Sequence, residues 1–326
     1  MKEKSKGLIS PSLLPAFSRV LMLVLLIVLG CIIDPSFISL RNIGNNLANA
    51  SILIILGVGE TVAIITAGPD LSAGSIMTMG AVVTAILLKT YNVNFVLAII
   101  AGVAVGALIG ALNGFMIAYI KLPAFISTYG LQWAVFGFAY VLLNGYVLYS
   151  FDDAFRFIGN GLIFKYFSMT TVCMIVIVAI GILLLKRTTF GRKCYSVGSN
   201  PTQAKMSGIN TKTVVLKAFI FSGAMSAFAG VLYVARMNSV QSDIGSAYLL
   251  NVLAAVYMGG TSAAGGEGGI PGTIVGALAM QIVLNCINLL ALPSELRDAV
   301  IGVLIIATVL LDTVVRKQVA KRKAAV

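Results

Sequence analysis

The sequence predicts an all-α protein that crosses a membrane many times. Of its 326 residues, 59% are hydrophobic and only 10% are charged, which leaves too few polar side chains to cover the surface of a soluble domain. The mean hydropathy is +1.01. Apolar stretches of about 20 residues, the length that crosses roughly 30 Å of hydrocarbon, recur along the chain. Because a helix satisfies its own backbone hydrogen bonds in lipid, we expect each stretch to be helical.

Each apolar window is interpreted as one helix. There are about ten such windows, and we expect roughly 8–11 spans. The windows are 17–34, 45–67, 74–90, 95–120, 124–146, 168–186, 213–236, 249–264, 270–290 and 296–314. The window at 249–264 is short and rich in glycine, so it is a candidate for a re-entrant segment. We expect one transmembrane domain over residues 1–326, with broken or re-entrant helices.

Positive charge marks one side of the membrane. The formal net charge is +12, and most Lys and Arg residues gather near the two termini and in the segment 186–217. Cytoplasmic loops are enriched in Lys and Arg. The number of windows between these clusters is even, so we expect both termini and 186–217 in the cytoplasm. The same distribution favours membrane topology over nucleic-acid binding as the reason for the charge.

The segment 147–167 falls on the opposite side of the membrane by this count. It is the longest segment expected there, and it carries Asp152 and Asp153. It is either a plain connector or a docking surface for an external partner.

The sequence does not indicate catalysis. The chain has no histidine, and its four cysteines stand apart, which gives no support for histidine acid–base chemistry, a CxxC pair or a clustered metal site. No GxxxxGK followed by Ser or Thr, the phosphate-binding loop, occurs in the chain. We therefore expect no catalytic residue, no metal and no cofactor in this chain.

Two glycine-rich breaks interrupt apolar runs in the same order. In AGPDLSAGS, either Asp70 or Ser72 can cap the helix that follows. In GGTSAAGGEG, Glu267 lies among five glycines, which permit turns that other residues resist. A backbone interrupted at membrane depth is tolerated where it lines a cavity or is buried, so the pair predicts an internal duplication that builds a pathway. The glycines assigned to these breaks are Gly68, Gly74, Gly259, Gly260, Gly265 and Gly266.

Polar side chains inside the predicted spans are candidates for a translocation pathway. Such groups are costly in lipid and usually face the bundle interior, although hydrogen bonding between helices explains them equally well. Neutral amides and hydroxyls suit an uncharged, hydroxyl-rich solute better than an ion. The candidates are Glu60, Asp70, Ser72, Asn113, Asn251, Gln281, Asn285 and Asn288. The last two lie three residues apart and are predicted to share a helix face.

A short helix is predicted inside the basic segment 186–217. Asn200 can act as its N-cap, Pro201 suits the first helical position, and Gly208 can end it in left-handed geometry. The expected helix covers about 201–207. It is either a solvated connector or a docking element that offers apolar side chains and a lysine to a partner. The residues assigned to docking are Gly191, Arg192, Asn200, Pro201, Ala204, Lys205, Met206, Gly208 and Ile209.

Several motifs occur together in a fixed order. They are AGPDLSAGS ending at Ser75, LPAFISTYG at 122–130, TTFGRKCYSVGSN at 188–200, SGIN ending at Asn210, GGTSAAGGEG at 259–268, PGTIVGAL at 271–278, and Asn285 with Asn288. As a set they resemble the ribose-type permease subunits of bacterial ABC importers, from about Pro35 to the end of the chain.

The resemblance implies a multi-pass permease of the bacterial inner membrane that imports a monosaccharide, a related sugar or a polyol. It implies a second permease copy or a paralogue, a separate cytoplasmic ATPase that binds the ATP, and a periplasmic or lipid-anchored solute-binding protein. It also implies that the helix after Asn200 docks on the ATPase.

The chain departs from the family pattern at a few positions. Leu249 and Asn251 stand where the family usually has an acidic pair, Phe136 and Gly137 replace a common Arg-Gly, and Pro69 replaces an apolar residue. These changes fit a sugar other than ribose, a polyol or a signalling sugar, or a heterodimer whose partner keeps the usual residues. The alternatives are a branched-chain amino-acid permease, an ion-coupled secondary transporter and, disfavoured by the absent histidine, a membrane enzyme.

Overall fold

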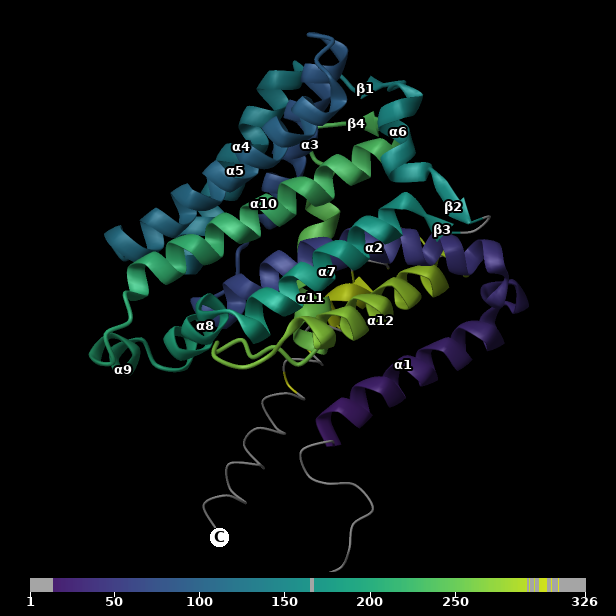
Figure 1. The fold of residues 1–326 in the computed structure, drawn as a ribbon. Helices are drawn as coiled ribbons and strands as arrows, with labels where there is room; N and C mark the ends of the chain where they lie inside the picture. The colour runs from purple at the N-terminus through teal and green to yellow at the C-terminus, as the bar shows by residue number, and fades with distance from the viewer. Residues whose placement is uncertain are drawn as a thin grey trace, which may run out of the picture.

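The computed structural model describes residues 14–164 and 167–291, together with 293, 296, 299–303, 306 and 310. Long helices run roughly alongside one another, and short strands lie toward one end of the bundle (Figure 1). In the described residues the sheet is limited to two pairs of very short strands. The all-α prediction is therefore confirmed.

The chain alternates long helices with short connecting elements. The longer helices are α1 (Leu14–Ile33), α2 (Leu40–Thr66), α3 (Ala73–Lys89), α4 (Phe95–Phe115), α5 (Ala124–Leu143), α7 (Met169–Arg187), α10 (Thr211–Met237), α11 (Ser246–Met258) and α12 (Ile270–Leu289). The short elements are the 3-10 helix η1 (Pro35–Ile38), the π-helical turn η2 (Met116–Ile120), α6 (Asp153–Asn160), α8 (Thr189–Ser199), α9 (Pro201–Met206), and the strands β1 (Leu148–Tyr149), β2 (Leu162–Phe164), β3 (Phe167–Ser168) and β4 (Ser239–Val240).

The apolar windows up to 270–290 each overlap one of the longer helices, although the window 249–264 runs past the end of α11 into the glycine-rich turn. In the described residues, six helices are long and apolar enough to cross a membrane, namely α2, α4 with η2, α5, α7, α10 and α12. The helix α11 has 13 residues and rises about 20 Å, which is less than the roughly 30 Å of a hydrocarbon core. The last window, 296–314, lies mostly outside the described residues, so the expected number of spans stays a prediction.

The bundle has two ends, which we call the α6 end and the α9 end after the short helices that lie there. At the α6 end, β1 pairs antiparallel with β4 and so ties the segment after α5 to the end of α10. At the α9 end, the Gly266 amide donates to the Ile65 carbonyl at 2.9 Å, and the Tyr195 hydroxyl donates to the Gly268 carbonyl at 3.0 Å. These two bonds hold the glycine-rich segment 259–268 against α2 and α8.

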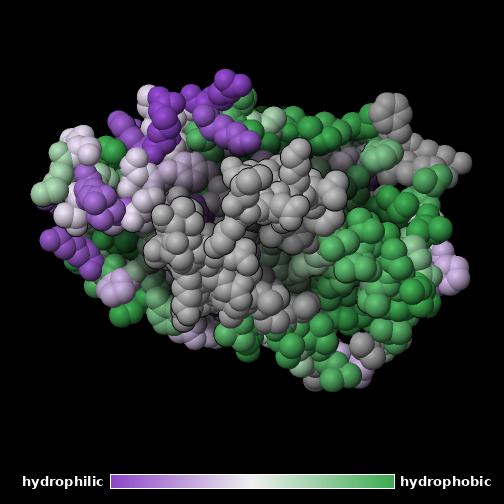
Figure 2. All heavy atoms as spheres, turned by 90° about the horizontal axis from the view of Figure 1, so that it is seen from below, coloured by the Kyte–Doolittle hydropathy of each residue, from purple (hydrophilic) through white to green (hydrophobic). Residues whose placement is uncertain are grey.

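Polar and apolar side chains separate along the bundle. Figure 2 shows hydrophilic side chains gathered on the left, where α8 and α9 lie, and hydrophobic side chains over much of the remaining visible surface. The helix α2 is buried on every face from Ala50 to Thr66, as expected for a helix that is apolar all round. The bundle is therefore built around α2, with a basic surface at the α9 end.

The helix α10 packs along α2, α3 and α4, and glycines make its contact with α4 unusually close. Gly106 and Gly110 of α4 face Gly223 and the backbone of Phe219. A Cβ atom placed on Gly110 would lie 2.2 Å from the Phe219 carbonyl oxygen. Small residues allow such backbone contact where lipid supplies no hydrophobic force between helices.

This contact predicts opposite effects for one substitution at two helical glycines. Gly110→Ala forces α4 away from α10 and is expected to destabilise the protein by about 1–3 kcal/mol, the usual cost of overpacking. Gly130→Ala in α5 meets nothing within 4 Å and gains up to about 1 kcal/mol of helix propensity. Thermal unfolding of the two purified variants in detergent measures the difference, and equal melting temperatures would contradict the packing described here.

Candidate functional site

The break between α2 and α3 folds back into the bundle. The helix α2 ends at Thr66, and Gly68 adopts φ +130°, a conformation that side chains rarely allow. The chain then returns alongside α2, so that the Asp70 amide donates to Glu60 Oε1 at 2.9 Å. Asp70 therefore lies beside the penultimate turns of α2, and α3 begins at Ala73 inside the bundle.

The Asp70 carboxylate is held by hydroxyl and backbone donors. Its Oδ1 accepts from the Ser72 amide at 3.1 Å and from Ser72 Oγ at 2.6 Å. Its Oδ2 accepts from Ser222 Oγ of α10 at 3.2 Å. Both Asp70 and Ser222 have no exposed surface, and a buried carboxylate requires such partners because burial removes its water. Ser72 is the N-cap residue of α3, but its side chain makes no capping bond. Asp70 accepts from the amide of Ser72 rather than from an amide inside the first turn of α3, so neither residue is a standard side-chain cap.

Two further helices join this cluster. Asn113 Nδ2 of α4 donates to Ser72 Oγ at 2.7 Å and, at 3.5 Å, to Asp70 Oδ1. Ser127 Oγ of α5 donates to Asn113 Oδ1 at 3.3 Å. We call the connected set the Asp70 network: Glu60, Asp70, Ser72, Asn113, Ser127 and Ser222. It joins α2, the break, α4, α5 and α10 through side chains that are all buried.

Glu60 is the member of the Asp70 network with spare hydrogen-bonding capacity. Its Oε1 accepts from the Asp70 amide, whereas its Oε2 is buried with no hydrogen-bond partner among the described residues. A buried polar atom without a partner is uncommon in native structures and calls for a reason. Here the Oε2 atom of Glu60 offers a hydrogen-bonding position inside the bundle.

A second interruption lies where α11 begins. The backbones of Gly74 in α3 and Gly245 before α11 touch, because a Cβ atom on Gly245 would lie 1.8 Å from the Gly74 carbonyl oxygen. The Gly245 amide donates to Thr78 Oγ1 at 3.0 Å. Gly74 and Gly245 are both buried, so α3 and α11 start against each other inside the bundle. The sequence did not predict this meeting, since QSDIGS before α11 lacks the glycine cluster of the other breaks.

The other predicted pathway residues lie apart from the Asp70 network. Gln281 Nε2 donates to Asn46 Oδ1 at 3.2 Å, and Asn285 Nδ2 donates to Asn42 Oδ1 at 3.1 Å. These bonds tie α12 to α2, which is the interhelical alternative considered for them.

Asn251 and Asn288 have different surroundings again. Asn251 is buried and donates to the Ala247 carbonyl of its own helix at 2.7 Å. Asn288 is exposed, whereas Asn285 is buried against α2, so the two side chains have different surroundings although their spacing places them on neighbouring parts of the helix surface. Residues three apart lie about 60° from each other around a helix. If the contact with α2 is narrow, one of them can lie inside it and the other outside.

The glycines of the second break form a turn at the α9 end. Gly260, Gly265 and Gly266 have φ between +71° and +82°, the left-handed region that glycine adopts without strain. Gly259 is not left-handed; it packs against Gly272, and its carbonyl accepts from Arg19 Nη1 of α1. The segment closes onto the ends of α1, α2 and α8 rather than entering the bundle as Asp70 does. The proposed duplication therefore stays a prediction.

The helix predicted at 201–207 is present as α9. Asn200 Oδ1 accepts from the Thr202 and Gln203 amides at 3.0 Å each, Pro201 occupies the first turn, and Gly208 has φ +78°. The capping chemistry that predicted this helix is confirmed. The preceding segment also forms a helix, α8, which the sequence analysis missed because its glycines and polar residues disfavour helix.

The exposed surface of α9 differs from the predicted one. Ala204 is only 4% exposed and packs inward, and Ile209 is half-buried. The prediction that both are available to a partner is therefore wrong for Ala204, and Ile209 offers a partner only part of its side chain. Met206 is 85% exposed, and Lys205 beside it is also exposed. The helix has only two turns, and the side that carries Ala204 is needed to hold it to the bundle.

Gly191 and Arg192 lie in the first turn of α8. Thr188 Oγ1 caps this helix by accepting from the Gly191 amide at 3.2 Å. A Cβ atom on Gly191 would lie 2.2 Å from the Leu185 carbonyl oxygen, so Gly191 lets α8 turn tightly back on α7. Arg192 is exposed. Gly191 thus has a structural role, and Arg192 belongs to the basic surface.

Comparison with known proteins gives the same family for most of the chain. Residues 42–309 match the family described as branched-chain amino acid transport system / permease component. The chain belongs to this permease family. It is a transport subunit of an ABC importer and not a catalytic enzyme, and it is a multi-pass protein of the inner membrane. Permeases of such importers work with a separate ATPase and a solute-binding protein.

The curated relatives of the permease are named as sugar importers. The ribose import permease protein of Escherichia coli is 34% identical over 298 residues, which cover 89% of this chain and 91% of the relative. The galactose/methyl galactoside import permease protein of Haemophilus influenzae is 32% identical over 320 residues, covering 92% and 94%. The fructose import permease protein of Rhizobium meliloti is 34% identical over 319 residues, covering 94% and 87%. No solved structure matches the permease significantly.

The Asp70 network predicts that an apolar side chain of similar size cannot replace the Asp70 carboxyl group without loss of stability. In Asp70→Leu, the donors from Ser72 and Ser222 lose their acceptor, and each buried donor left unpaired costs about 1–3 kcal/mol. Asp70→Asn keeps one oxygen for Ser72 and can turn its amide toward the Ser222 hydroxyl oxygen, so it is expected to cost less. Melting temperatures of the purified permease variants test this order. An Asp70→Leu permease as stable as Asp70→Asn would show that the network does not hold the break.

Proposed function

We propose that the permease imports a monosaccharide or a related sugar or polyol across the bacterial inner membrane, driven by a separate ATPase. The observation that carries this proposal is the Asp70 network, in which one amide and three hydroxyl side chains surround the carboxyl group of Asp70 at the start of an interior helix. Such groups match the hydroxyls of a sugar, which both donate and accept hydrogen bonds. Sugar importers among the relatives support the same solute class.

The proposed orientation places the α9 end in the cytoplasm. Lys186 and Arg187 close α7 at that end, and Arg192, Lys193 and Lys205 are exposed on α8 and α9. Cytoplasmic segments carry an excess of such residues. Both termini lie on this side in the proposed topology, and α6 faces outward.

The proposed contact with the ATPase is α9. Met206 is an unusually exposed apolar side chain, and Gly208 has open space around it. The chain passes from α9 through Asn210, which caps α10 by accepting from the Thr213 amide at 3.2 Å. Since α10 also carries Ser222 of the Asp70 network, a movement of α9 on ATP binding can reach the pathway through one continuous helix.

The proposed assembly contains a second permease subunit in the membrane lipid. Either another copy of this chain or a paralogue satisfies the proposal. The departures at Leu249, Asn251 and Phe136 are consistent with a paralogue that supplies the usual residues.

The family description gives one specific reason to keep branched-chain amino acids as a second candidate. The solute-binding protein that restores ATP-driven uptake by the permease distinguishes the two. We expect its melting temperature to rise with monosaccharides or polyols and to stay constant with leucine. A rise with leucine and none across a panel of sugars and polyols would replace the sugar assignment by the amino-acid one.

The proposed docking of α9 predicts a selective effect of Met206→Ser. Removal of this apolar side chain is expected to lower ATPase co-purification with the permease about tenfold, corresponding to the roughly 1–2 kcal/mol of a buried interface methionine. Sugar uptake is expected to fall with it. Tyr146→Ser, which shortens a similarly exposed side chain at the α6 end, is the control for co-purification. Full ATPase recovery with Met206→Ser and unchanged uptake would refute docking through Met206.

A further inference from the structure

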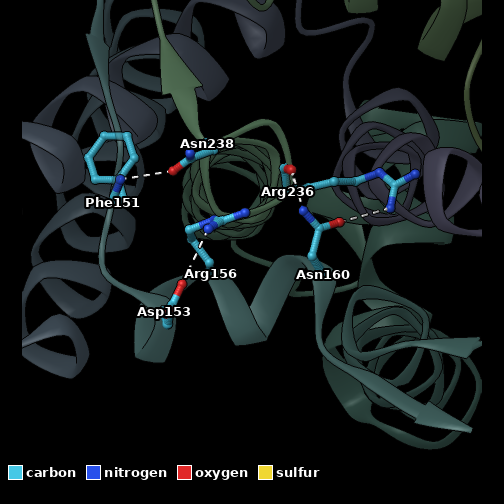
Figure 3. Close-up of polar contacts among 6 residues, drawn as sticks. All are labelled: Phe151, Asp153, Arg156, Asn160, Arg236 and Asn238. Atoms are coloured by element: carbon cyan, nitrogen blue, oxygen red, sulfur yellow. Dashed lines mark hydrogen bonds and ion pairs between the residues drawn. The ribbon is translucent and has the colours of Figure 1, made fainter.

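The helix α6 lies across the outer end of α10 and has two unlike faces. Its residues Phe155 and Gly159 are buried on the side that faces the bundle, and its residues Asp153 and Phe157 are exposed. Figure 3 shows α6 carrying Asp153, Arg156 and Asn160 beside the end of α10. Because α6 has only eight residues and lies at one end of the bundle beside the end of α10 in Figure 1, it is a surface element rather than part of a membrane crossing.

The end of α6 is fastened to α10 and α2. Asn160 Nδ2 donates to the Arg236 carbonyl at 2.6 Å, and Arg236 Nη1 donates back to Asn160 Oδ1 at 3.5 Å. Arg236 Nε donates to Asn49 Oδ1 of α2 at 3.1 Å. Gly159 allows this approach, since a Cβ atom there would lie 2.3 Å from the Arg236 amide nitrogen.

The start of α6 is fastened as well. Asn238, the residue that follows α10, accepts from the Phe151 amide through Oδ1 at 2.8 Å and from the Ser150 amide through its carbonyl at 3.2 Å. Thr170 Oγ1 of α7 donates to the Gly159 carbonyl at 2.6 Å. A plain connector needs none of these bonds. Together with the bonds of Asn160, they fasten α6 to α7 and to the outer end of α10.

The exposed face of α6 combines acidic and aromatic groups. The Asp153 side chain is 98% exposed, and its ion pair with Arg156 at 3.2 Å is a surface pair of little strength. Asp152 is exposed beside it, and Tyr149 and Phe157 are 69% and 54% exposed. Aromatic side chains ringed by charge are typical of protein interfaces. Two carboxylates are unsuited to the phosphates of lipid headgroups and favour a partner with lysine or arginine.

We propose that this face of α6, formed by Tyr149, Asp152, Asp153 and Phe157, is the docking surface for the solute-binding protein, which contacts it with basic residues around an apolar patch. This assignment rests on the proposed function, since it requires an importer with an external binding protein. The bonds of Asn160 and Asn238 then join the docked protein to α10, whose other end follows α9.

The test uses the complete importer, permease with ATPase, in nanodiscs, and measures binding of its solute-binding protein by surface plasmon resonance. Asp153→Lys reverses the charge at the centre of the surface and is expected to weaken binding about tenfold and to flatten its dependence on salt, since steering by opposite charges is lost. Basal ATP hydrolysis is expected to stay unchanged. The control is Ser36→Lys, which adds a lysine to the exposed η1 on the same side of the membrane and is expected to bind normally.

Each other outcome counts against the surface assigned here. Equal affinity of Asp153→Lys and the unchanged importer, or an equal loss with Ser36→Lys, overturns it. A loss that disappears in nanodiscs of phosphatidylcholine alone points to anionic lipid as the occupant, and separation of the permease subunits points to a second copy. Failure of the unchanged importer to take up any sugar with its binding protein contradicts the proposed function instead, so the two failures are distinguishable.

Discussion

The interior of the permease depends on how the Asp70 carboxylate is held. A charge removed from water is tolerated only when hydrogen-bond donors replace the water, and at Asp70 these come from Ser72 and from Ser222 of α10. Because Asn113 and Ser127 extend the same chain of bonds, four helices and the break are positioned around one side chain. The interrupted backbone can persist inside the bundle because its polar groups are satisfied in this way.

The helix α10 brings the main features of the molecule together. It follows α9 at one end, contributes Ser222 in its middle, and is fastened to α6 through Arg236 and Asn238 at the other end. Its glycine contacts with α4 bring the two backbones so close that no side chain fits between them. A helix that is tightly packed along its length moves as a body, so its ends and its middle cannot shift independently.

Much of this arrangement was predictable from the sequence, for identifiable physical reasons. Capping chemistry is local, so Asn200, Pro201 and Gly208 predicted α9 nearly to the residue. Acidic residues in apolar surroundings are rare, so Glu60 and Asp70 were visible as interior groups, and the structure places Ser72 and Asn113 with them. Ser127 and Ser222 were missed because serine in a helix commonly bonds its own backbone and gives no distinctive signal.

Other features require tertiary knowledge that a single sequence lacks. The side of α9 that Ala204 occupies depends on where α8 lies. The separate surroundings of Asn285 and Asn288 depend on how narrow the contact with α2 is. The meeting of Gly74 with Gly245 joins segments about 170 positions apart in the chain, a distance over which spacing rules carry no information.

The helix α11, which begins against α3, is also short for a membrane protein. With α11 rising about 20 Å and the hydrocarbon core measuring roughly 30 Å, α11 is too short to span the core by itself, and Gly245 lies at its N-terminal end. The chain from Gln241 to Gly245 is not helical and includes Ser242 and Asp243. A path that crosses the core along α11 would therefore be helical over only about two thirds of its length, and turn residues such as Ser242 and Asp243 would line part of the remainder.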